Sequence, residues 1–152
     1  MKLTKKLAAT LFASAGLASA LVPLTASSAS AVSKYGCSYP RVCVYGGSYS
    51  GGSIIGWFQD NGYQNMPLSI QNKPDAVVNT RNDDSVWLID TGANPDRYIC
   101  IPANTAANLG DYAHPNKTTW ANDVDTINIF NDDGRCSGTN QVRQGTVPAN
   151  WP

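Results

Sequence analysis

The chain has 152 residues, of which 42% are hydrophobic, with 11 basic and 11 acidic side chains. Three of the lysines lie within the first six residues, so the rest of the chain carries eight basic side chains (11 − 3) and a net charge of about −3. No cluster of Lys or Arg remains there, which argues against nucleic acids and anionic membranes as partners. Every acidic residue is Asp, a residue that favours turns, and this usage favours a turn-rich β-protein.

Residues 1–31 have the pattern of a secretory signal peptide. The three lysines precede an apolar run from Leu7 to Leu24, and the Ala-x-Ala cleavage site ends at Ala31. A membrane anchor is the alternative, but the run is rich in Ala, Ser and Gly and contains Pro23. We therefore expect a secreted, extracellular protein of 121 residues (152 − 31) that begins at Val32, enough for one domain with a core.

The chain contains four cysteines, Cys37, Cys43, Cys100 and Cys136. An even number in an exported protein favours two disulfides over free thiols or a metal site. Three pairings are open, and we favour Cys37 with Cys43 and Cys100 with Cys136, because the first pair flanks a short turn. The longer bridge would then stabilise the fold by about 3 to 4 kcal/mol.

Two segments have the pattern of a β-hairpin. The first runs from Val42 to Phe58, where two Gly-Gly pairs separate runs of residues that favour strands. The second joins a strand at Val86–Ile89 to a strand at Arg97–Ile101 through the turn residues 90–96. Two hairpins of one design indicate a duplicated β-unit.

The segments around the hairpins complete two related units. We expect strands at Ala76–Asn79 and Thr126–Phe130, a turn-rich loop at Gln59–Asn65, and a polar loop with at most one helical turn at Pro102–Tyr112. Asn72 and Asn122 precede the two strands and are 50 residues apart (122 − 72). The fold class is therefore all-β, with two Greek-key units packed as one sandwich over residues 32–136 and a C-terminal tail over residues 137–152 that we expect to be extended.

Several segments resemble a known family. They are Cys43-Val44-Tyr45 with its Gly-Gly turn, Phe58-Gln59-Asp60-Asn61-Gly62-Tyr63-Gln64-Asn65, and Trp120-Ala121-Asn122-Asp123 before a strand. Together with the signal peptide, they resemble the secreted bacterial metalloproteinase-inhibitor family over about Cys37 to Phe130. The resemblance implies a βγ-crystallin-like fold and inhibition of an extracellular protease. We also expect a monomer. The family's small disulfide-tied loop in the second half has no counterpart, because Cys100 has no cysteine close by in the sequence.

An inhibitor needs an exposed segment that is already extended and rigid, so that little entropy is lost on binding. The segment Ser38–Val42 would be closed by the first disulfide and stiffened by Pro40, and it offers Tyr39 and Arg41 as specificity side chains. Tyr39, Pro40 and Arg41 are therefore the expected protease contacts. A disulfide that only fixes the N-terminus is the alternative. The turn from Asp90 to Arg97, with a proline inside it, is a second candidate loop.

Calcium is the one metal that the sequence suggests, and no other cofactor is expected. Crystallin-type calcium sites resemble a six-residue pattern of Asn or Asp followed by Ser or Thr, whose oxygens suit a hard cation. Asn122, Asp123, Asp125 and Thr126 fit that pattern, but Ile127 takes its sixth position. The alternative is a turn that only opens a strand. The first-half equivalent, 72–77, has a lysine in its second position.

Two further functions are alternatives to inhibition. A module that binds cell-wall carbohydrate would use exposed rings, chosen from Trp57, Trp87, Trp120, Trp151 and Tyr63, although a domain of this size needs most of its rings in the core. An enzyme is not expected, and no catalytic residue is assigned. The only histidine, His114, lies in a loop without a nucleophile motif, and we expect it to be exposed.

Overall fold

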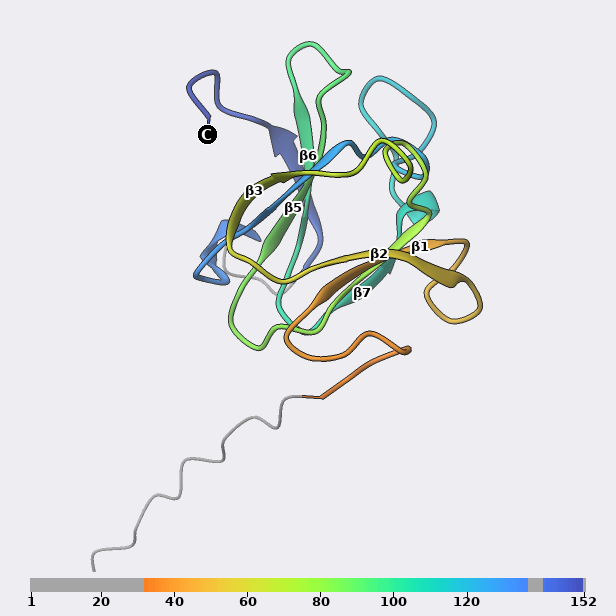
Figure 1. The fold of residues 1–152 in the computed structure, drawn as a ribbon. Helices are drawn as coiled ribbons and strands as arrows, with labels where there is room; N and C mark the ends of the chain where they lie inside the picture. The colour runs from red at the N-terminus through yellow and green to blue at the C-terminus, as the bar shows by residue number, and fades with distance from the viewer. Residues whose placement is uncertain (1–31, 137–140, 152) are drawn as a thin grey trace, which may run out of the picture.

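The computed structural model describes residues 32–136 and 141–151, and the predicted signal peptide lies outside these residues. The described chain is almost entirely β-structure, arranged as two antiparallel sheets (Figure 1). The strands are β1 (Val42–Gly46), β2 (Ser53–Phe58), β3 (Gly62–Asn65), β4 (Ala76–Asn79), β5 (Val86–Asp90), β6 (Arg97–Ile101), β7 (Ala106–Asn108), β8 (Thr126–Ile129) and β9 (Arg143–Thr146). Two short 3-10 helices are η1 (Leu109–Asp111) and η2 (Gly134–Cys136).

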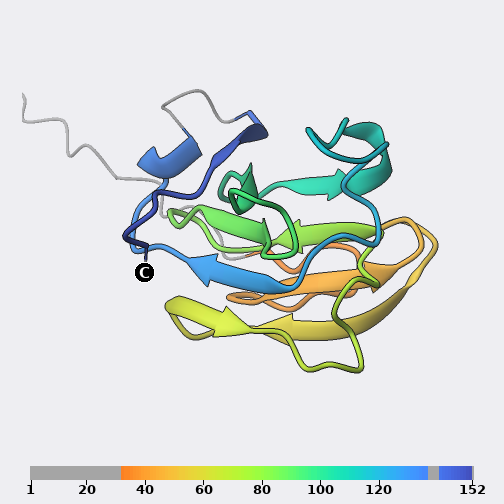
Figure 2. The same cartoon turned by 90° about the horizontal axis from the view of Figure 1, so that it is seen from above.

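The two units exchange one strand each. The first sheet has the order β2-β1-β4-β7 and the second has the order β3-β8-β5-β6-β9. Strand β3 belongs to the first half of the chain but pairs with β8, while β7 belongs to the second half but pairs with β4. Figure 2 shows β8, in blue, between β3 and the green β5. The prediction of an all-β sandwich built from two related units is confirmed.

The main core lies between the two sheets. Val42, Val44 and Val77 from the first sheet meet Leu88 and Ile127 from the second, and all five are fully buried. Because side chains alternate along a strand, the residues between them face outward. Those outward faces are covered as well, and this explains why the sequence shows continuous apolar runs instead of alternation.

Each disulfide fixes one end of the chain to an outer face. Cys37 is bonded to Cys43 of β1, beside buried Tyr45, so the first bridge holds the N-terminal segment on the first sheet. Cys100 of β6 is bonded to Cys136, which lies against the outer face of the second sheet. Both predicted pairings are confirmed, and all four cysteines are paired.

The predicted hairpins and strands agree with the structure to within a few residues, but three short strands were missed. Residues 62–65 were predicted as a loop and form β3, and β7 with η1 lies inside the predicted polar loop. Strand β9 lies in the predicted tail and pairs with β6, and Val147 and Trp151 pack beside it in an outer cluster. Residues 143–151 are therefore part of the domain. In the described residues, no helix is long and apolar enough to cross a membrane.

Candidate functional sites

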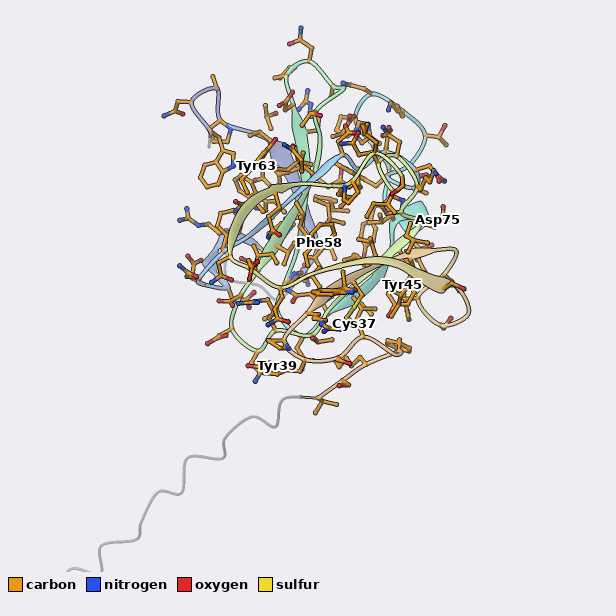
Figure 3. All side chains as sticks on the ribbon, in the orientation of Figure 1. Cys37, Tyr39, Tyr45, Phe58, Tyr63 and Asp75 are labelled. Carbon is orange, nitrogen blue, oxygen red and sulfur yellow. A yellow bond between two sulfur atoms is a disulfide. The ribbon has the colours of Figure 1, made fainter. Side chains whose placement is uncertain are left out.

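Exposed rings gather around the first disulfide. Trp57 and Ile54 lie on the outer face of the edge strand β2, opposite Cys43 and Tyr45 of β1, and the N-terminal segment adds Tyr35 and Tyr39. The exposed fractions are 53% for Tyr35, 40% for Tyr39, 38% for Ile54 and 53% for Trp57. We call these four residues, with Arg41, the aromatic surface. Figure 3 shows Tyr39 beside Cys37, far from Tyr63.

Three residues of the aromatic surface, Tyr35, Arg41 and Trp57, are held by local contacts. The guanidinium carbon of Arg41 lies 4.0 Å from the centre of the Trp57 ring, a cation–π contact. The ring of Tyr35 lies 4.7 Å from that of Tyr49, and its carbonyl accepts a hydrogen bond of 2.9 Å from the Tyr45 hydroxyl. These contacts join the exposed rings to the sheet below them.

The segment Ser38–Val42, the expected protease-contact loop, is a tight turn and is not held extended. The Arg41 N–H donates to the Ser38 carbonyl at 3.0 Å. The Arg41 carbonyl accepts from the backbone and the hydroxyl of Thr80 at 3.0 and 2.7 Å, and the Pro40 carbonyl accepts from Arg81 Nη1 at 3.1 Å. Because these carbonyls are already bonded, the segment cannot pair with a protease as a substrate strand does. The expected turn between the two cysteines is therefore confirmed, the extended conformation that substrate-like inhibition needs is not found there, and Tyr39 is exposed.

The second candidate loop is only partly accessible. It begins at Asp90, which is buried and accepts a hydrogen bond of 2.8 Å at Oδ1 from the Gly92 N–H. Asn94 and Pro95 are exposed at its tip. The base of this loop contributes to a different feature, a polar pocket.

A pocket of about 570 Å³ lies where the two units meet. Its lining is mostly polar and includes all four residues that were considered as calcium ligands, Asn122, Asp123, Asp125 and Thr126. We call it the polar pocket. The four residues of the motif therefore line one pocket, but they make different contacts in it.

Two of these four residues join the units to each other. Asn122 Nδ2 donates to Asp75 Oδ1 at 2.8 Å. Asp125 accepts from Asn72 Nδ2 at 2.7 Å, and its second oxygen accepts from the N–H and the hydroxyl of Thr91 at 3.0 and 3.1 Å. Both Asp125 oxygens thus accept hydrogen bonds within the protein, which agrees with the alternative of a purely structural turn.

Asp90 and His114 form a buried pair beside the pocket. His114 was expected to be exposed, but its side chain is 0% exposed, and its Nε2 lies 3.3 Å from Asp90 Oδ2. The ring packs edge-on against Trp120 at 4.4 Å, and burial in this corner is the reason the prediction failed. Sequence alone gave no signal for this pair, because 24 residues separate its members (114 − 90).

The hydrogen bond at Nδ1 of His114 shows which of the two ring nitrogens carries the proton. Nδ1 accepts a hydrogen bond of 3.1 Å from the Asn116 N–H, so the neutral ring carries its proton on Nε2, facing Asp90. Burial lowers the pKa of His114, and the charge of Asp90 partly opposes this effect, whereas Lys117 and Arg97 lower the pKa further. His114 is therefore neutral near pH 7, and its buried Nε2 makes no hydrogen bond, although it lies 3.3 Å from Asp90 Oδ2.

Lys117 supplies the positive charge of this corner. Its ammonium group bonds to Asp123 Oδ1 and lies 3.9 Å from Asp90 Oδ2, while its side chain is half exposed. Asp90, His114 and Asp123 each offer an atom that could bind a metal, and these atoms lie within 4.8 Å of one another. The sequence prediction included Asp123 but missed the other members of the cluster.

The tryptophans differ in how far they are buried, as we expected for a domain of this size. Trp120 is fully buried and Trp87 is nearly so, stacked on Tyr98 at 3.9 Å, while Trp57 is exposed. Tyr63 is also exposed, on β3. A sugar-binding platform could therefore use few of the rings considered for it.

No family model, no curated protein and no solved structure matches the chain. The resemblance to secreted metalloproteinase inhibitors therefore depends on the residue segments quoted above.

Proposed function

We propose that the protein is a secreted inhibitor of an extracellular metalloprotease, which it binds through the aromatic surface. The observation that carries the proposal is the composition of that surface. Two exposed tyrosines, one exposed tryptophan and a partly buried arginine lie around the first disulfide, on a scaffold that two disulfides stabilise. Trp, Tyr and Arg are the residues that dominate binding energy in protein interfaces.

The rigidity of the surface supports binding to a folded partner. Tyr39 and Arg41 belong to a turn that is closed by a disulfide and by hydrogen bonds from Thr80 and Arg81. A side chain that is already held in place loses less entropy when it is buried against a partner. Inhibition would then follow from covering the entrance to the active site, without insertion of a substrate-like strand.

The class of the target comes from the sequence resemblance. Binding to cell-wall carbohydrate is the alternative, because exposed rings also bind sugars. The guanidinium of Arg41 lies over one face of the Trp57 ring, so at most one face is left for a stacked sugar. This contact favours a protein partner over a polysaccharide.

The test is a titration of a thermolysin-like metalloprotease with the oxidised protein, with a serine protease in parallel. We expect stoichiometric loss of activity for the metalloprotease alone. A pulldown with insoluble peptidoglycan and with chitin tests the alternative. Retention on a polysaccharide without inhibition of the metalloprotease would overturn the proposal in favour of the carbohydrate-binding function.

A further inference from the structure

The polar pocket contains buried oxygens whose hydrogen-bonding capacity is not used. Asp90 Oδ2 and Thr126 Oγ1 make no hydrogen bond, and Asp90 and Thr126 are 1% and 2% exposed. The groups near Asp90 Oδ2 are His114 Nε2 at 3.3 Å and Lys117 Nζ at 3.9 Å, neither within hydrogen-bonding geometry. Both residues line the pocket together with Asp123. Because a buried polar atom without a partner costs free energy, such atoms at the wall of a pocket indicate a missing ligand.

The charges around these oxygens favour a cation. Asp90 and Asp123 carry two negative charges, and the half-exposed ammonium of Lys117 is the cation that contacts both. Asp125 adds a third carboxylate, which is satisfied by Asn72 and Thr91. Arg97 lies opposite Asp90 in the strand register, but its Nη1 bonds to Thr146 Oγ1.

The geometry suits one ion. The candidate ligand atoms of Asp90 and Asp123 lie within 4.8 Å of each other, and an ion bound at about 2.4 Å from each oxygen can bridge atoms up to about 4.8 Å apart. His114 does not join as a ligand, because its Nδ1 accepts from Asn116 and its Nε2 carries the proton. The donor set is therefore made of oxygens, which suits calcium better than zinc.

We propose that Asp90, Asp123 and Thr126 form a binding site for a hard divalent cation, with calcium as its ion, and that Lys117 is a built-in competitor for that site. This site differs from the motif considered in the sequence, since Asn122 and Asp125 are used to join the units. The calcium ion would displace the Lys117 ammonium into solvent, which a half-exposed side chain allows. The competition makes the site weak, in the range of extracellular calcium modules.

The experiment measures the melting temperature and the binding heat of the EDTA-treated, oxidised protein with Ca²⁺, Mg²⁺ or Zn²⁺. In the wild-type protein we expect Ca²⁺ at about 10 mM to raise the melting temperature by a few degrees, with little effect of Mg²⁺. Lys117→Gln should bind Ca²⁺ at least about tenfold more tightly, because the competing charge is gone. Lys73→Gln is the matched control, since Lys73 bonds to the Ser69 carbonyl outside the cluster.

Asp123→Asn and Thr126→Val should each weaken the response, and Asp111→Asn, an exposed carboxylate in η1, should not. Any of three results would overturn the proposal. These are no calcium response in the wild-type protein, an equal response in Lys117→Gln and Lys73→Gln, or a zinc response larger than the calcium response. The pocket shares no residue with the aromatic surface, so this test is independent of the inhibitor titration.

Discussion

Asn72 donates a hydrogen bond of 2.7 Å from its Nδ2 to Oδ1 of Asp125, from one unit of the sandwich to the other. Asn122 returns the same contact to Asp75 at 2.8 Å, and the sequence spacing within each Asn-x-x-Asp segment is identical. The backbone repeats the exchange, since the N–H of Asn72 donates to the Val124 carbonyl and that of Asn122 donates to the Pro74 carbonyl, each at 2.9 Å. The duplicated sequence thus produces a two-fold clamp between the units.

Replacing Asn72 should separate the two contributions of this residue to the clamp. Asn72 has a φ of 54°, a conformation that glycine adopts freely and alanine does not. Asn72→Gly removes the side-chain hydrogen bond alone, whereas Asn72→Ala also adds backbone strain. We expect Asn72→Ala to lower the free energy of unfolding by about 1 kcal/mol more than Asn72→Gly does, as measured by urea denaturation. Equal losses would contradict the role of the backbone conformation.

The buried histidine should make stability depend on pH. Burial lowers the pKa of His114 in the folded protein, so the unfolded chain binds a proton more readily. The contribution of His114 to the free energy of unfolding is therefore fully present above the unfolded pKa of about 6.5. It declines as the pH falls below that value. Urea denaturation at several pH values between 7.5 and 5.5, centred on about 6.5, measures this decline.

His114→Asn is the matched variant for that measurement. Its side-chain oxygen can accept the Asn116 N–H in place of Nδ1, and it does not titrate. We expect its stability to change less over the same pH range than that of the wild-type protein. The same slope in both proteins would show that other groups cause the pH dependence.

The two disulfides should contribute unequally. The bridges close segments with sequence separations of 6 and 36 residues. On the chain-entropy model, replacing both cysteines of the longer bridge by alanine should cost about 4 kcal/mol, and replacing those of the shorter bridge about 2 kcal/mol. Urea denaturation of the two double variants compares them. The opposite order would mean that the first bridge does more than restrict the unfolded chain.

Strand β9 should depend on a single glycine. A Cβ at Gly145 would lie 2.5 Å from the Tyr98 hydroxyl oxygen and 2.7 Å from a carbon of its ring, and Tyr98 is stacked on Trp87. Gly145→Ala should cost about 1 to 3 kcal/mol and change the tryptophan fluorescence, because the ring must move. Gly110→Ala, where an added Cβ meets nothing within 4 Å, is the control. A silent Gly145→Ala variant would argue against the packing of β9 on β6.

The sequence predicted those elements whose signals are local. The first hairpin was found because Gly-Gly pairs interrupt residues that favour strands, and the disulfide pairing followed from the short turn. Strands β3, β7 and β9 were missed because they are short and have few apolar residues. Such edge strands are defined by the neighbour they pair with, and β3 and β7 pair with strands of the other unit.

The candidate sites were predictable only in part. The Asn-Asp pattern placed four residues in the polar pocket, since they follow one another in the chain. Asp90, at the end of β5, meets His114 and Lys117 from the loop before β8, and no local sequence pattern links these residues. Only part of the aromatic surface could be predicted from the sequence. Tyr39 and Arg41 belong to the disulfide turn, but Trp57 joins them because β2 pairs with β1.

The most direct test of the inhibitory function is the inhibition constant of Trp57→Ala against a thermolysin-like metalloprotease. Trp57 is an exposed ring of the aromatic surface in contact with Arg41, and Leu68→Ala is the matched control because Leu68 is an exposed apolar residue, at 86%, that is not part of the surface. We predict an inhibition constant at least about tenfold higher for Trp57→Ala and no change for Leu68→Ala. Equal inhibition by Trp57→Ala and the wild-type protein, or no inhibition by the wild-type protein, would contradict the proposed function.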